Sequence, residues 1–155
     1  MDIPAKSDYA VRAMLALAEL TADDPDSLAT VEQLADRQGL PRKFLEAILR
    51  DLRRGGLVRT RRGARGGYSL ALPPTEITIG MILRAVDGPL AEVRGLRPHE
   101  THYAGAAEHL PTLWVAVRAA LRDVLDTTTV EQLRAGKLSA RVRRLAEAPD
   151  AWESR

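Results

Sequence analysis

The chain has 155 residues, of which 45% are hydrophobic and 28% are charged, and it contains no cysteine. This length and composition predict one folded core with an appended arm and exclude disulfides, thiolate metal sites and cysteine-held clusters. No apolar run approaches the roughly 18 residues that a membrane span needs, and no basic-then-apolar leader begins the chain, so we expect a cytoplasmic protein that does not contact membranes.

The net charge of +2 is unevenly distributed along the chain. Residues 1–40 carry three basic and eight acidic side chains, whereas residues 41–68 carry nine basic and two acidic ones. Residues 69–155 balance, with eleven of each. The basic block indicates a surface that binds a polyanion, and a solvated basic face is the alternative.

Three helices are predicted in the first third of the chain. Apolar residues recur every three or four positions over 7–20, and a Thr30 capping box begins a short helix over 31–38. Pro41 begins a third helix that runs to residue 54. Its predicted buried stripe consists of Leu45, Ile48, Leu49 and Leu52.

A hairpin and a fourth helix are predicted next. The strands are 57–61 and 68–72, and the glycine-rich segment 62–67 allows a tight reversal between them. Thr78 can cap a helix over 79–87, after which the chain is irregular up to about residue 110.

A long helix is predicted from residue 110 to about residue 126. Its apolar residues are spaced by four, three, four and three positions, a period of 3.5 that favours packing against a partner helix. A second capping box at Thr129 begins a short helix that ends at Gly136, and the last residues are a weakly patterned tail. The predicted dimer seam consists of Leu110, Trp114, Val117, Leu121 and Val124.

Three helices followed by a glycine-tipped hairpin predict a mainly α (α+β) winged helix-turn-helix with a two-stranded wing and a long C-terminal dimerisation helix. We expect residues 1–88 to form the DNA-binding domain and 89–109 a connecting and sensing loop. Residues 110–136 hold the dimerisation helix and the following short helix, and 137–155 form the tail.

The outward face of the third helix and the wing carry side chains suited to a DNA groove. Arginine binds guanine bidentately, lysine and arginine neutralise phosphate, glutamate accepts from cytosine, and a narrow minor groove attracts arginine. For each residue the alternative is a solvated surface. The candidate DNA-binding residues are Arg42, Lys43, Glu46, Ala47, Arg50, Arg61, Arg62 and Arg65.

Several segments carry a resemblance to a known family: KSDYAVRAM at 6–14, FLE at 44–46, LRRGGLV at 52–58, RGARGGYSL at 62–70 and VDGP at 86–89. They resemble the Rrf2 family of bacterial winged-helix transcription regulators. The resemblance implies a homodimer that is joined through the long helix and binds an imperfect palindrome near promoters. It also implies that Glu46 helps to set base preference and that Arg62 reaches the minor groove.

Many members of that family hold an iron–sulfur cluster through three cysteines in the loop before the long helix, and some add an acidic ligand from the first helix, where this chain has Asp8. Because cysteine is absent, we expect no cluster and no other cofactor. The chain resembles the cysteine-free branch, which responds to other signals or to a partner protein. The loop histidines His99, His102 and His109 are candidate metal ligands, but their spacing matches no established motif, so exposed or dimer-contact histidines are the favoured interpretation.

No nucleophile elbow, phosphate-binding loop or dinucleotide fingerprint occurs, so we expect no enzymatic activity. The predicted function is that of a DNA-binding transcription regulator, a homodimeric repressor. Its expected partners are double-stranded DNA, a second copy of the chain, and a small-molecule effector or partner protein. The alternatives are a winged-helix module for protein contacts, whose basic face is incidental, and a histidine-based metal-responsive regulator.

Overall fold

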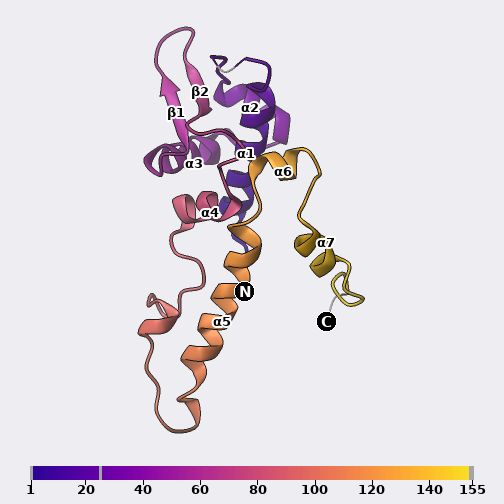
Figure 1. Cartoon of the computed structure of the whole chain (residues 1–155). Helices are drawn as coiled ribbons and strands as arrows, with labels where there is room; N and C mark the ends of the chain where they lie inside the picture. The colour runs from indigo at the N-terminus through magenta and orange to yellow at the C-terminus, as the bar shows by residue number, and fades with distance from the viewer. Residues whose placement is uncertain (1, 25, 154–155) are drawn as a thin grey trace.

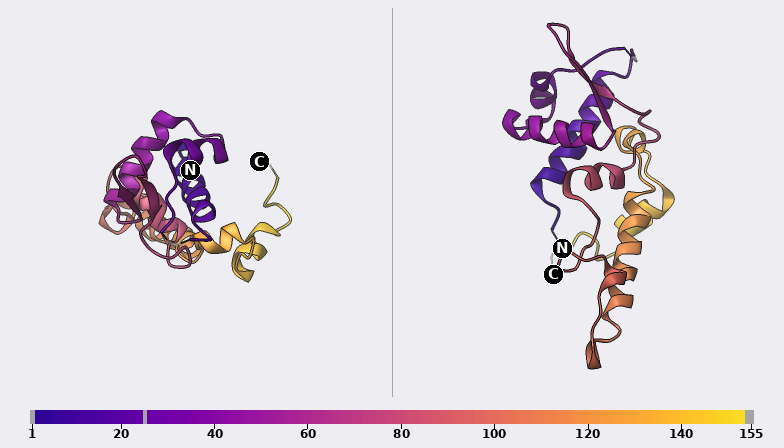
Figure 2. Two further views of the ribbon diagram at one scale, coloured as in Figure 1. Left: turned by 90° about the horizontal axis from the view of Figure 1, so that it is seen from above. Right: turned by 90° about the vertical axis from the view of Figure 1, so that its left-hand side faces the viewer.

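The structure, a computed structural model, covers residues 2–24 and 26–153 and has two parts, which we call the head and the stalk. The stalk consists of α5 (Leu110–Leu125) and the loop 88–109 that runs beside it, and it projects from the head (Figures 1 and 2). The head comprises α1 (Ala5–Leu20), α2 (Val31–Gln38), α3 (Arg42–Arg54), β1 (Val58–Arg61), β2 (Gly67–Leu70), α4 (Ile79–Asp87) and α6 (Val130–Arg134).

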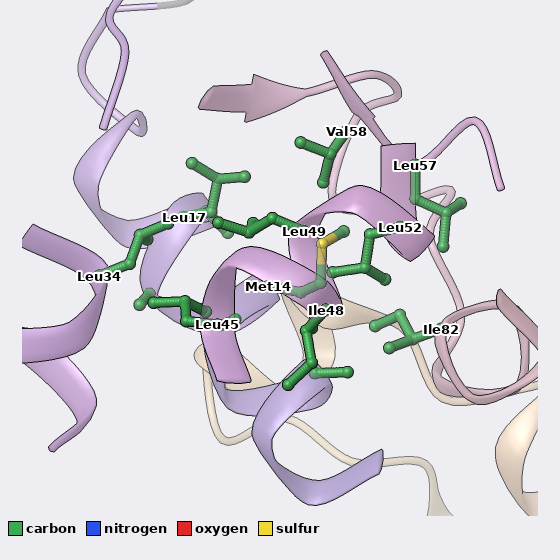
Figure 3. Close-up of a cluster of buried hydrophobic side chains, with 14 of the residues drawn as sticks. Met14, Leu17, Leu34, Leu45, Ile48, Leu49, Leu52, Leu57, Val58 and Ile82 are labelled. Carbon is green, nitrogen blue, oxygen red and sulfur yellow. The ribbon is translucent and has the colours of Figure 1, made fainter. Parts of the chain in front are cut away.

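Helix α1 is the centre of the head. It contacts α2, α3, α4, α6 and β2. Small residues on its buried side, among them Ala10 and Ala13, allow neighbouring helices to approach closely, and Met14 and Leu17 fill the space between them (Figure 3). This side carries the apolar periodicity from which the helix is predicted, and the helix begins two residues earlier than expected.

The turn between α2 and α3 forms as predicted. The Thr30 hydroxyl accepts from the Gln33 backbone N–H at 3.2 Å, and the Thr30 N–H donates to Gln33 Oε1 at 2.8 Å, which completes the capping box. Gly39 ends α2 in the left-handed conformation, with φ of 62°. All four predicted stripe residues of α3 are buried, and Figure 3 shows them packed among side chains of α1 and the wing base.

The wing is an antiparallel pair in which Val58 faces Leu70 and Arg61 faces Gly67. β1 begins one residue later than predicted, at Val58, and β2 begins one residue earlier and ends two residues earlier than predicted, at Gly67 and Leu70. A Cβ on Gly66 would lie 2.2 Å from the Arg61 carbonyl oxygen, so the reversal requires glycine there. Backbone hydrogen bonds between Tyr68 and Ala29 tie the wing to the head.

The stalk and α6 differ sharply in burial. No residue of α5 is fully buried, and its main contact within the chain is the 3-10 turn Pro98–Glu100. Helix α6 returns to the head, where Val130 is completely buried and its N–H donates to the Ile77 carbonyl at 2.9 Å. The predicted capping box at its start, made by Thr129 and Gln132, is present.

Local structure also forms where the sequence pattern is weak. A second 3-10 turn, Gly105–Ala107, lies in the expected irregular stretch, and α7 (Ala140–Ala146) lies in the segment expected to be a tail. The Ser139 hydroxyl caps α7 by accepting from the Val142 N–H at 3.3 Å. Among the residues covered by the structure, no helix is long and apolar enough to cross a membrane.

Candidate nucleic-acid interface

The outward face of α3 is polar and exposed, because the apolar stripe of the helix lies on the opposite face and is buried in the core. Arg42, Lys43, Glu46, Ala47 and Arg50 are all exposed, on the side away from the buried leucine and isoleucine stripe. The structure thus brings the five predicted α3 residues together on one accessible surface.

Most of the cations on this surface have no carboxylate partner. Arg42 forms an exposed ion pair with Glu32 of α2, with 3.4 Å between nitrogen and oxygen. Within residues 2–24 and 26–153, no carboxylate lies within 4 Å of the charged groups of Lys43 or Arg50. Their charges are therefore available to an external anion.

The wing adds three more exposed arginines. Arg61 Nη2 donates to the Arg65 carbonyl oxygen at 3.2 Å and so braces the tip from within. The Arg62 and Arg65 side chains are exposed and form no ion pair in the part of the chain that the structure covers. Because β1 contacts α3, the wing lies next to the helix that carries the other exposed cations.

Lys6 fixes the position of α3 against the rest of the head. Its ammonium lies 2.8 Å from a carboxylate oxygen of Asp51 and also donates to the Val86 carbonyl in α4. The hydrogen bond from Lys6 lowers the pKa of Asp51 below its ordinary value, and the positive charges of Lys6, Arg54 and Arg50 act in the same direction. One lysine of α1 thus joins α3 to α4.

One exposed side chain of α3 was missed in the sequence prediction. Phe44 is 62% exposed, and its ring meets Tyr9 edge to face, with centroids 6.5 Å apart and an interplanar angle of 69°. The available signal is its place at the edge of the apolar stripe, in the first turn of α3, where Tyr9 of α1 covers only part of the ring. An exposed aromatic side chain therefore lies beside Lys43 on the basic surface.

The predicted seam of α5 is half-buried along its whole length. Trp114, Val117 and Leu121 line an apolar groove of about 570 Å³, whose other wall includes Ile3 and Leu90 of the same chain. Other apolar side chains of α5, including Leu113 at 52% exposure, are open to solvent.

The loop histidines do not assemble into a metal site. His99 Nδ1 accepts from Arg118, His102 Nδ1 donates to the Glu100 carbonyl at 3.0 Å, and His109 lies 3.3 Å from Glu108. Within the residues that the structure places, no group of three or more histidine, cysteine, aspartate or glutamate side chains is arranged to hold a metal ion.

The structure has a winged helix-turn-helix fold, which defines a class of DNA-binding proteins. In it, α3 is the recognition helix, α2 supports it from behind, and the arginine-rich β1–β2 hairpin is the wing. The family model for Rrf2, described as an iron-dependent transcriptional regulator, matches residues 3–136. The chain belongs to the Rrf2 family of transcriptional regulators.

Individual relatives agree with this assignment. A Mycobacterium tuberculosis protein that carries the name of an HTH-type transcriptional regulator is 43% identical over 154 residues, which cover 99% of this chain and 94% of the relative. The HTH-type transcriptional regulator CymR of Bacillus subtilis is 36% identical over 86% of this chain and 89% of its own length. The solved structure of that CymR, titled the global cysteine regulator, has a TM-score of 0.69 at 32% identity and covers 88% of this chain and 98% of the CymR chain.

The family description mentions iron, and the residues of this chain show whether it can hold an iron–sulfur cluster through cysteine. A cysteine-held cluster needs thiolate ligands, and this chain has none. The loop instead offers histidines that are engaged with an arginine, a backbone carbonyl and a neighbouring glutamate. These residues do not fit a cysteine-ligated iron–sulfur cluster.

Proposed function

We propose that the protein is a homodimeric repressor that occupies an imperfect palindrome in promoter DNA. Helix α3 of each protomer enters a major groove, and the two half-sites lie about 10 base pairs apart. The observation that carries this proposal is the exposed basic surface over α3 and the wing, on which Lys43, Arg50, Arg62 and Arg65 have no acidic partner among the residues in the structure. A regulator of this kind works in the cytoplasm, where bacterial DNA lies.

Each side chain on the basic surface has a chemical role in this proposal. Arg42, Lys43 and Arg50 bind phosphates or a guanine edge, and Glu46 accepts from cytosine or excludes a wrong base. Ala47 leaves room for a base edge, and Phe44 offers an apolar contact to a thymine methyl group. In the wing, Arg62 inserts into the minor groove, Arg61 braces the tip and Arg65 binds phosphate.

The second protomer packs on the stalk. The seam residues Leu110, Trp114, Val117, Leu121 and Val124 are only half-covered by their own chain, and Leu113 is open to solvent. Burying this apolar surface against the same surface of another copy removes it from water and stabilises a twofold dimer. The loop 89–109 links the head to this helix, so a small effector or partner protein bound there can change the separation of the two recognition helices.

The salt dependence of DNA affinity tests this function. Duplexes selected from a random pool by the protein itself are titrated by fluorescence anisotropy between 50 and 200 mM salt. We expect a loss of about 10³-fold if roughly six phosphates are contacted. The double variant Lys43→Gln, Arg50→Gln is expected to bind more weakly, with a slope that is shallower by roughly two.

The matched control is Arg143→Gln, Arg144→Gln, which removes the same charge from exposed positions of α7. We expect it to bind as the native chain does. An equal loss in both double variants, or no duplex binding at low salt, would favour the protein-contact alternative, in which the basic face is incidental.

A further inference from the structure

Four arginines from three segments converge on a second cavity, which we call the arginine cavity. It lies between α4, α5 and the loop 88–109, and it has a volume of about 570 Å³. This volume is within the usual range of about 300–1,000 Å³ for small-molecule sites. The arginines that line it are Arg84, Arg97, Arg118 and Arg122.

The positive charge in this cavity exceeds the negative charge. Among the residues that the structure describes, Asp126 is the one acidic residue that lines it, and its carboxylate already accepts hydrogen bonds. Arg84 donates to it twice, at 2.8 and 2.7 Å, and Arg122 donates once, at 3.2 Å. These hydrogen bonds, led by those from Arg84, lower the pKa of Asp126, so the carboxylate remains ionised in its place.

The other two guanidinium groups lack a counter-ion. Arg118 Nη2 donates to His99 Nδ1 at 3.3 Å and has no carboxylate partner among the residues that the structure describes. Arg97 makes no ion pair in the part of the chain covered by the structure; its backbone N–H, not its side chain, binds Glu100 at 2.9 Å. Two guanidinium groups without a carboxylate partner therefore line a site in which the one described carboxylate already binds Arg84 and Arg122.

The Arg84–Asp126 pair fixes the wall of this cavity, and Gly80 makes room for it. A Cβ on Gly80 would lie 1.9 Å from Asp126 Oδ1, so the carboxylate occupies the space that a side chain of α4 would fill. The pair joins α4 to the end of α5, two elements that make few other contacts. Helix α4 in turn packs on α1 and α3, which connects the cavity to the recognition helix.

We propose that the arginine cavity binds a small anion with carboxylate or phosphate groups and that this anion regulates DNA binding. The regulatory part rests on the proposed function, whereas the binding part does not. Planar guanidinium groups bind carboxylates and phosphates through paired, charge-assisted hydrogen bonds, and Arg97 and Arg118 both retain N–H donors that no carboxylate occupies. An anion held between them fixes the loop and α5 against α4, and so selects one orientation of the head on the stalk.

Calorimetric titration of the full chain tests the binding step. The probes are inorganic phosphate and succinate, and succinamide is the uncharged analogue of the second. We expect saturable binding of at least one anion, no binding of succinamide, and a loss of about tenfold or more in Arg97→Gln, Arg118→Gln. Comparing the two anions distinguishes a phosphate ligand from a carboxylate ligand.

The control is again Arg143→Gln, Arg144→Gln, which is expected to bind the anion as the native chain does. Unchanged thermal unfolding midpoints would show that both double variants are folded. Absence of saturable binding by both anions, or an equal loss in the two double variants, would overturn the proposal.

The effect on DNA is measured separately, at constant ionic strength set with sodium chloride. The saturating anion is expected to shift the DNA affinity of the native chain, and Arg97→Gln, Arg118→Gln is expected to bind DNA with native affinity but without that shift. Arg62→Ala is expected to lose DNA affinity and retain anion binding, so a failure of the DNA function leaves the anion site testable. If the Arg97, Arg118 variant lost DNA affinity in the absence of the anion, the cavity would belong to the DNA surface instead.

Discussion

Neighbouring arginines of the wing differ in what they are free to contact. The Arg61 side chain donates a hydrogen bond to the Arg65 carbonyl oxygen. The Arg62 side chain has no hydrogen-bond or ion-pair partner in the part of the chain that the structure places. An unengaged guanidinium at the tip can enter a minor groove, and the negative potential there is strongest where the groove is narrow.

Arg62→Ala is accordingly expected to weaken DNA binding by about tenfold or more at sites with an A·T-rich narrow minor groove, and less at other sites. Arg50→Ala, on α3, is expected to weaken all sites alike if it binds phosphate. Competition binding with a panel of duplexes measures both. Equal effects of Arg62→Ala on every sequence would exclude shape readout by this residue.

The Asp126 carboxylate makes the stability of the protein depend on pH. Its pKa is lower in the folded chain than its ordinary value, chiefly through the hydrogen bonds from Arg84. A lowered folded pKa means that the pair stabilises the protein fully above the unfolded pKa of about 3.9, and that this contribution is lost as the pH falls through the folded pKa.

Asp126→Asn is therefore expected to cost about 1 kcal/mol of unfolding free energy at pH 7. The difference between variant and native chain should narrow as the pH falls below about 4, because the unfolded chain then binds a proton at Asp126 that the folded chain binds only at its lower pKa. Urea unfolding at a series of pH values measures this. A gap of constant size between pH 7 and pH 3 would show that the charge of Asp126 is not what stabilises the contact.

At the scale of elements, α6 is short but helps to close the hydrophobic core of the head. It has five residues, yet Val130 is completely buried in the head, and backbone hydrogen bonds join this segment to Ile77, Ile79 and Pro74. The core of the head is thus closed by a segment that follows the stalk.

Val130→Ala is expected to lower the unfolding free energy by about 2 kcal/mol, because it removes two buried methyl groups and leaves a cavity beside α1. Val115→Ala, on an exposed part of α5, makes the same chemical change and should cost much less. Thermal or urea unfolding compares the two variants. Equal costs would mean that α6 is only loosely docked.

The elements that could be predicted are those whose signals are local. The Thr30 and Thr129 capping boxes and the apolar stripe of α3 each lie within a few residues, and all three form as expected. What could not be predicted depends on distant parts of the chain: Lys6 meets Asp51, and Arg84 meets Asp126 across 42 positions. Helix α7 was missed because its seven residues show too little apolar periodicity, and Phe44 because the same stripe that marks the core also passes close to it.

At the scale of the whole molecule, the exposed stalk is the feature that a second copy would cover. Leu121→Asp puts a charge into the apolar groove that Trp114 and Val117 also line. We expect this variant to be monomeric at micromolar concentration and to bind a palindromic duplex far more weakly than the native chain. Leu145→Asp, the same change on an exposed position of α7, is the matched control.

Analytical ultracentrifugation gives the mass of each variant, and circular dichroism checks that the head remains folded. A Leu121→Asp protein that stayed dimeric with unchanged dissociation would place the interface elsewhere on the surface.

The return of α6 to the head also sets an order of events during translation. A nascent chain that ends before α6 lacks Val130, so its head has an open hydrophobic gap. The long helix leaves the exit tunnel before that gap can close. The exposed surface of α3 and the wing therefore reaches its final rigidity only after α5 has already been made.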